Sequence, residues 1–137
     1  MALKFARSAA EQAKRELGIT VERTGRTIVI AATGRIDLAT EMPWHDAVMA
    51  ACTAEADTRR IVVDLTQVSF LSWASTAVLL RAHRACQRRQ RTLRVLACGP
   101  VLTGLQLTQL DEEITVTPTL RTVEPPTPIG TSGWLIA

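Results

Sequence analysis

The sequence predicts an α/β fold in a single domain, with a mixed sheet of four or five strands and helices mainly on one face. β-branched strand patterns alternate with helix-spaced apolar patterns along the chain, which is typical of a partly parallel sheet with right-handed crossovers. The first two strand patterns flank one short glycine-containing turn, so we expect them to pair antiparallel. With 137 residues, of which 47% are hydrophobic and 21% charged, the chain can bury a core without a disulfide or metal.

The first elements follow from local spacing. Residues 1–18 are predicted to form a helical extension, because alanines recur at helical intervals and Gly18 is a natural stop. Residues 19–24 and 27–32 are β-branched runs around the turn and predict a hairpin. Gly34 is expected to break the second strand.

Thr40 is predicted to cap a helix that runs to about residue 56, with Trp44 and Val48 on its apolar stripe. The later elements are a strand over 60–65, a helix over 74–89, a strand over 92–97, a helix over 101–110 and a strand over 114–117. We therefore expect a domain over 19–120. Residues 121–137, rich in proline, are predicted to be an extended tail, whose final apolar residues either fold back onto a groove or stay mobile.

Composition excludes several classes of protein. No apolar run is long enough to span a bilayer, and Lys4 and Arg7 interrupt the start before a signal peptide can form. We expect a cytoplasmic protein without direct membrane insertion. The three cysteines, Cys52, Cys86 and Cys98, lack metal-ligand spacing; they are interpreted as inert core thiols or, if two lie close together, as a redox switch. No metal or other cofactor is predicted.

The usual enzyme signatures are missing. The sequence has no phosphate-binding G-x-x-x-x-G-K-[ST] loop, no G-x-G-x-x-G, no H-E-x-x-H and no G-x-S-x-G, so we predict no catalytic residue and no enzyme. Six arginines without an intervening acid occupy positions 81, 84, 88, 89, 91 and 94. They indicate a solvated basic face or a patch for an acidic partner; nucleic-acid binding is not predicted.

The most informative stretch joins a buried strand to a helix N-terminus at Ser72. Free backbone N–H groups and the helix dipole favour negative charge there. A hydroxyl at this point either caps the helix or accepts a phosphate, which adds about −1.5 to −2 charges and can repel a partner.

Four segments together resemble the STAS domain of bacterial anti-sigma-factor antagonists. They are Gly34-Arg-Ile-Asp-Leu-Ala-Thr40, Ile61-Val-Val-Asp-Leu65, Val68-Ser-Phe-Leu71 and Ala77-Val-Leu-Leu-Arg-Ala-His-Arg84. The resemblance implies a domain with no active site of its own that binds an anti-sigma factor, which is also a serine kinase. Binding frees the sigma factor, and phosphorylation of the antagonist breaks the complex.

This chain departs from the family pattern at the phosphorylation switch. The family usually reads Asp-Ser-[Ser/Thr]-Gly before the second helix, and here those positions are Ser72, Trp73, Ala74 and Ser75. Ala74 stands where the phosphate is usually accepted and cannot be phosphorylated. Ser72, Ser75 and Thr76 are nearby substitutes at other positions. Trp73 is either a binding hot spot or packs against the preceding loop.

The resemblance also implies a partner surface. Asp37 matches the family's acidic residue after the second strand and either contacts the partner or forms the turn before a helix. Leu38 and Thr40 are expected to share that surface with Ser72, Trp73, Ser75 and Thr76. The competing hypothesis is an accessory subunit of a transporter ATPase or another signalling assembly, and homodimerisation is left open.

Overall fold

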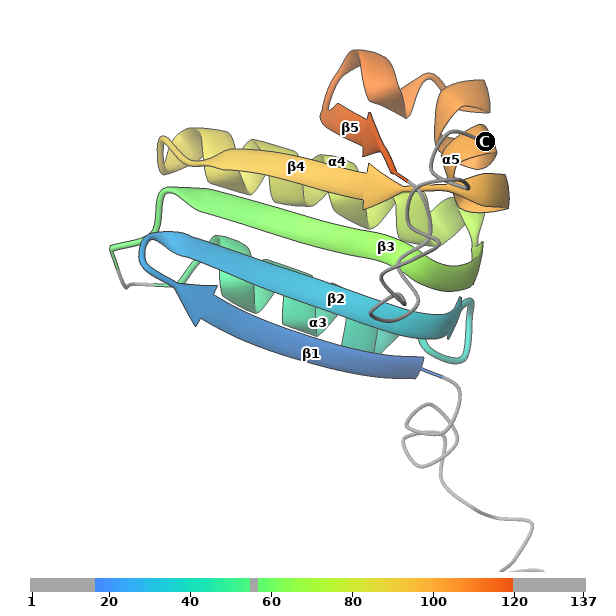
Figure 1. The fold of residues 1–137 in the computed structure, drawn as a ribbon, viewed down its shortest axis with the longest axis horizontal. Coiled ribbons are helices and arrows are strands. Elements are labelled where there is room, and N and C mark those ends of the chain that lie inside the picture. The colour runs from blue at the N-terminus through green and yellow to red at the C-terminus, as the bar shows by residue number, and fades with distance from the viewer. Residues whose placement is uncertain (1–16, 55–56, 120–137) are drawn as a thin grey trace, which may run out of the picture.

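The computed structural model describes residues 17–54 and 57–119, which form a sheet with three α-helices (Figure 1). The strands are β1 (Leu17–Thr24), β2 (Thr27–Ile36), β3 (Arg60–Leu71), β4 (Thr92–Ala97) and β5 (Thr115–Pro118). The helices are α3 (Glu41–Cys52), α4 (Trp73–Arg88) and α5 (Gly99–Leu107), followed by a short 3-10 turn, η1 (Leu110–Glu112). No helix in these two ranges is long and apolar enough to cross a membrane.

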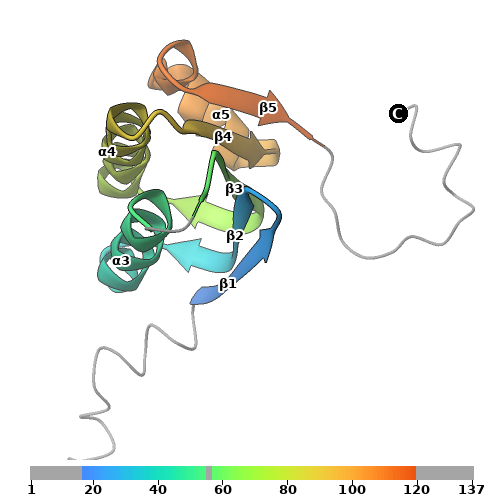
Figure 2. The same cartoon turned by 90° about the vertical axis from the view of Figure 1, so that its left-hand side faces the viewer.

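The strands lie in the order β1-β2-β3-β4-β5. β1 and β2 are antiparallel, and all later neighbours are parallel. Gly25 takes a φ of 62° in the hairpin turn, a conformation that glycine adopts without strain. Helices α3 and α4 cover one face of the sheet (Figure 2), while α5 contacts β3. The predicted α/β architecture with a mixed sheet is confirmed.

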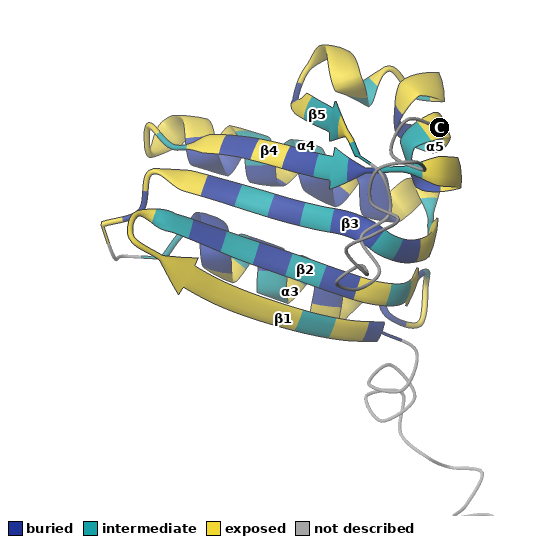
Figure 3. Cartoon of the chain, viewed as in Figure 1, coloured by how far each residue is buried: buried dark blue, intermediate teal, exposed yellow. Residues whose placement is uncertain are grey.

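Buried and partly exposed side chains alternate along the central strands, so the sheet has one buried face and one open face. Ile28 and Ile30 of β2 and Ile61 and Val63 of β3 are fully or almost fully buried, and the residues between them are partly exposed (Figure 3). Successive side chains of a strand point to opposite faces, so the buried set faces α3 and α4. Leu79 of α4 is among the fully buried residues that close this core.

Several predicted boundaries need correction. Leu17 and Gly18 begin β1 and are not the end of a helix; the rest of the predicted N-terminal helix, like the tail over 121–137, lies outside the described residues. Helix α3 ends at Cys52, short of the predicted residue 56. Helix α5 occupies Gly99–Leu107 and not 101–110, because Pro100 is well suited to the first turn of a helix.

The sequence predicted a break in the second strand at Gly34, and the structure has a bulge there, after which the strand continues. β2 continues to Ile36, and its register with β3 shifts between Gly34 and Arg35. Gly34 has a φ of 104°, which a β-bulge can use without strain. Ser69 Oγ donates a hydrogen bond to the Gly34 carbonyl over 3.2 Å. Since β3 also continues to Leu71, both strands extend to the same end of the molecule.

Candidate functional site

The ends of β2 and β3 bring two predicted site regions together. The backbone N–H of Ser72, after β3, donates to the carbonyl of Ile36, the last residue of β2, over 2.9 Å. Asp37 and Trp73 are the next residues along their segments, so they lie at the same end of the sheet. Trp73 is 75% exposed, which rules out its packing against the preceding loop.

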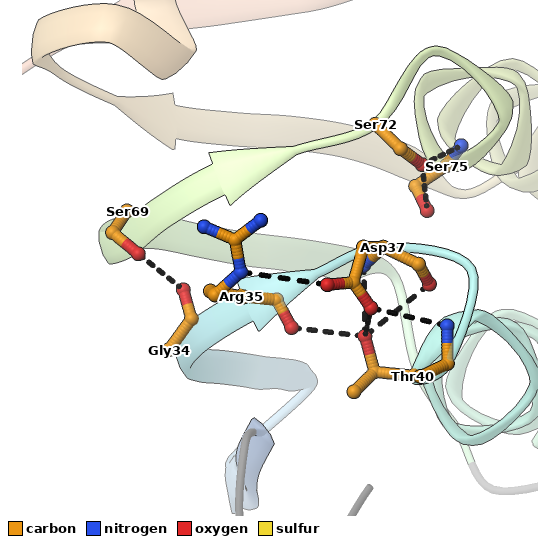
Figure 4. Close-up of polar contacts among 8 residues, drawn as sticks. Gly34, Arg35, Asp37, Thr40, Ser69, Ser72 and Ser75 are labelled. Carbon is orange, nitrogen blue, oxygen red and sulfur yellow. Dashed lines mark hydrogen bonds and ion pairs between the residues drawn. The ribbon is translucent and has the colours of Figure 1, made fainter.

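Asp37 is built into the turn that follows β2 (Figure 4). Its Oδ1 accepts a hydrogen bond from the backbone N–H of Ala39 over 3.1 Å, and its Oδ2 lies 3.4 Å from Nε of Arg35. The guanidinium of Arg35 also stacks 4.6 Å from the centre of the Phe70 ring. Asp37 therefore has the predicted turn role, and its side chain keeps 25% of its surface exposed.

Thr40 is the N-cap residue of α3, as predicted, but its hydroxyl has a different role. Its hydroxyl makes no capping bond to α3, and the residue is fully buried. The hydroxyl instead accepts from the Asp37 N–H over 2.9 Å and donates to the Arg35 carbonyl over 2.9 Å. The expectation that Thr40 contacts a partner is therefore wrong; its side chain fixes the turn that holds Asp37.

Ser72 caps α4, as one of its two interpretations predicted. Its hydroxyl accepts from the Ser75 N–H over 3.1 Å and donates to Ser75 Oγ over 2.9 Å (Figure 4). Thr76 Oγ1 donates to the Trp73 carbonyl over 2.6 Å. Ser75 is fully buried and Thr76 is 9% exposed, so the expectation that Ser75 and Thr76 face a partner is wrong. The same burial argues against both as substitute phosphate acceptors.

Four large apolar side chains in the segments at this end of the sheet are exposed, and the sequence predicted only two of them, Leu38 and Trp73. They come from four successive segments: Leu38 after β2, Met42 in the first turn of α3, Phe70 near the end of β3 and Trp73 at the start of α4. They are 86%, 63%, 41% and 75% exposed, respectively. Met42 and Phe70 were missed, although Phe70 lies in the Val-Ser-Phe-Leu segment. We call these four side chains the apolar patch.

Arg35 was also missed as a site residue. It lies between the predicted glycine and aspartate of the Gly34–Thr40 segment, and it joins Asp37 to Phe70 through its ion pair and ring contact. The sequence contained a signal for this ion pair, because the arginine and the aspartate are two residues apart at the end of one strand. Ala74 is exposed beside this cluster and presents only a methyl group.

The cysteines are placed in and near the core. Cys52 and Cys86 are fully buried, and the interaction between the two thiols together with burial raises the pKa of the Cys52 thiol. Cys98 is partly exposed, and its thiol lies 3.5 Å from the Thr66 carbonyl. Within the described residues, no group of three or more His, Cys, Asp or Glu side chains is arranged to hold a metal ion.

The predicted basic run is not one uniform face. Arg81, Arg84, Arg88, Arg89 and Arg94 are exposed. Arg91 instead donates to the carbonyls of Cys52 and Ala54 at the end of α3. Its guanidinium therefore stabilises a helix C-terminus.

Residues 19–120 match the family model described as "Mlab, STAS domain". Among curated proteins, the chain is similar to the anti-sigma-F factor antagonist RsfA of Mycobacterium tuberculosis, in strains CDC 1551 and H37Rv, with 31% identity over 81 residues. The match covers 59% of this chain and 63% of RsfA. It thus spans less than two thirds of the curated relative.

Two solved structures are similar to this fold. An anti-sigma factor antagonist from Mycobacterium paratuberculosis superposes with a TM-score of 0.69 and 25% identity, over 77% of this chain and 88% of that one. The Bacillus cell fate determinant SpoIIAA, in its phosphorylated form, superposes with a TM-score of 0.59 and 15% identity, over 86% of this chain and 99% of that one.

Proposed function

Since this chain belongs to the STAS domain family, we propose that it is a cytoplasmic regulator that resembles anti-sigma-factor antagonists and acts by binding, without catalysis. RsfA and the M. paratuberculosis protein are both named as such antagonists. The partner that this resemblance favours is an anti-sigma factor with serine-kinase activity. Binding would withdraw that factor from its sigma factor.

The observation that carries this proposal is the set of large apolar side chains exposed at the end of the sheet where Asp37 lies. Tryptophan is among the residue types most enriched in binding hot spots. Trp73 is 75% exposed, and it follows Ser72, whose backbone N–H is bonded to the Ile36 carbonyl. We therefore expect Trp73 to contribute most of the affinity, with Leu38 and Asp37 beside it.

Capture of the partner tests the proposal. The tagged full chain is used as bait in lysate of its native host, next to Trp73→Ala and the control Val21→Thr. Val21 is 54% exposed on β1 and keeps its shape as threonine. We expect an anti-sigma factor to be enriched by the unaltered chain and the control, and to be lost with Trp73→Ala. Equal capture by all three chains would contradict a partner site at the apolar patch.

We further propose that the usual serine switch is lost. Ala74 has no hydroxyl at the matching position, and the Ser72 hydroxyl is already bonded to Ser75 on both its donor and acceptor sides. Incubation with the captured kinase and ATP, followed by mass spectrometry, is expected to leave residues 72–76 unmodified. Stoichiometric phosphate on Ser72 that abolishes binding would show that the switch has moved by two positions.

A second candidate function is an accessory subunit of a transporter ATPase. The absence of a phosphate acceptor at Ala74 supports it, because such a subunit needs no phosphorylation switch. Both candidates use a protein-binding surface and differ in the class of partner. Enrichment of a transport ATPase, in place of an anti-sigma factor, would favour this second role.

A further inference from the structure

The end of the sheet opposite the apolar patch carries a cluster of arginines. The β1–β2 turn, the start of β3 and the turn before β4 meet there (Figure 1). The backbone N–H groups of Arg59 and Arg60 both donate to the Arg26 carbonyl, over 2.8 and 3.1 Å, and the Thr92 N–H donates to the Arg59 carbonyl over 2.9 Å. These bonds hold the arginine-bearing segments at fixed positions.

The pairing of neighbouring strands places further hydrogen-bond donors, from arginine and threonine side chains, on the open face of the sheet. Arg60 pairs with Thr27 on one side and with Thr92 on the other, and Arg94 pairs with Val62. The adjacent residue Ile61 is buried against the helices. Since side chains alternate along a strand, Arg60 and its paired threonines face away from α3 and α4, on the side that Figure 2 shows free of those helices.

The surface is hollowed at this place. A depression of about 510 Å³ is lined by Thr24, Arg26, Thr27, Arg59, Arg60, Gln90 and Thr92. A neighbouring one of about 410 Å³ shares Thr27, Arg60 and Thr92 and adds Arg94 with Ile61 and Val62. Four guanidinium groups, three hydroxyls and one amide thus line one continuous region, which we call the arginine depression.

Most of this positive charge is unpaired. Arg26 lies 3.2 Å from Asp57, in an ion pair whose two side chains are 61% and 70% exposed. Arg59, Arg60 and Arg94 make no ion pair or side-chain hydrogen bond with the described part of the chain. Like charges held together repel one another, and an anion between them relieves that repulsion. The electrostatics of the depression therefore favour the binding of an anion.

The donor set selects the kind of anion. Guanidinium groups present planar pairs of N–H donors that match phosphate oxygens, and threonine hydroxyls add further donors. No aromatic ring lines either hollow, so a nucleoside base has no stacking partner there. The arginines line both hollows: Arg26 and Arg59 line the first, Arg94 lines the second and Arg60 lines both. We propose that the arginine depression binds a chain of two or more linked phosphates.

Such a chain occurs as inorganic oligophosphate or as part of a nucleotide. Calorimetric titration of the full chain with sodium tripolyphosphate, ATP and orthophosphate, without magnesium, separates these sources. We expect tripolyphosphate to bind at least 10-fold more tightly than orthophosphate. Similar affinities for tripolyphosphate and ATP would support recognition of the phosphate chain alone, whereas binding of ATP without binding of tripolyphosphate would overturn the proposal.

Two charge-removing variants test the location. Arg60→Gln combined with Arg94→Gln is expected to weaken tripolyphosphate binding at least 10-fold. The control Arg81→Gln removes an exposed charge from α4, on the other face of the sheet, and is expected to bind as the unaltered chain does. Equal affinity of the double variant and the control, with unchanged melting temperatures, would mean that net charge alone attracts the ligand. Polyglutamate that binds as tightly as tripolyphosphate would also refute recognition of phosphate.

Discussion

The turn that holds Asp37 depends on one buried hydroxyl, and Thr40→Val removes it while keeping the shape of the side chain. Two hydrogen bonds of 2.9 Å are lost, one from the Asp37 N–H and one to the Arg35 carbonyl. At a net contribution of about 1 kcal/mol each, the free energy of unfolding should fall by about 2 kcal/mol. For a domain of this size the melting temperature should fall by roughly 8 °C. Urea unfolding followed by circular dichroism measures the change.

Two further variants make this prediction specific. Thr40→Ser keeps the hydroxyl and loses one buried methyl group, so it should bind the partner normally with a stability loss of about 1 kcal/mol. Thr20→Val alters an exposed threonine on β1, where a change within about 0.5 kcal/mol is expected. If Thr40→Val unfolds at the same urea concentration as the unaltered chain, the hydroxyl does not organise the turn and the argument fails.

Two other predictions concern the cap of α4 and the thiols. Ser72→Ala should lower the free energy of unfolding by about 1 kcal/mol through loss of the helix cap, and Ser72→Asp should restore most of this free energy. Urea unfolding measures both changes. Equal stability of the two variants and the unaltered chain would contradict the capping role. Cys98 should react first with a chromogenic disulfide reagent. Cys52 and Cys86 should react only after unfolding, because both are buried and the pKa of Cys52 is raised. Rapid reaction of all three thiols with the reagent in the folded protein would contradict this burial.

The fold could be predicted because its signals are local and repeated. The strand over Thr92–Ala97 was predicted to the residue, and α4 begins one residue before its predicted start. The bulge at Gly34 could not be predicted in the same way. A glycine with a positive φ ends many strands, and only pairing with β3, more than thirty residues away, lets β2 continue to Ile36.

The sequence brought the Asp37 and Ser72 segments to one end of the sheet and included the turn and cap interpretations of these two residues, but it did not show which hydroxyls are buried. Sequence order places Asp37 and Ser72 after neighbouring parallel strands, whose carboxyl ends share one edge of a sheet. It does not reveal which hydroxyls point inward. Thr40 and Ser75 have polar side chains of a type usually found on the surface, yet both are fully buried. Each can be buried because its hydroxyl forms hydrogen bonds within its own turn. Burial of this kind depends on tertiary packing, which periodicity does not record.

The buried hydroxyls also bear on regulation. Ser72, Ser75 and Thr76 each already hydrogen-bond within the first turn of α4. A phosphate on Ser72 would have to break the bonds that cap the helix before it could repel a partner, whereas Ala74 is exposed and has no hydroxyl to modify. An anion in the arginine depression, at the far end of the same strands, would leave the apolar patch intact.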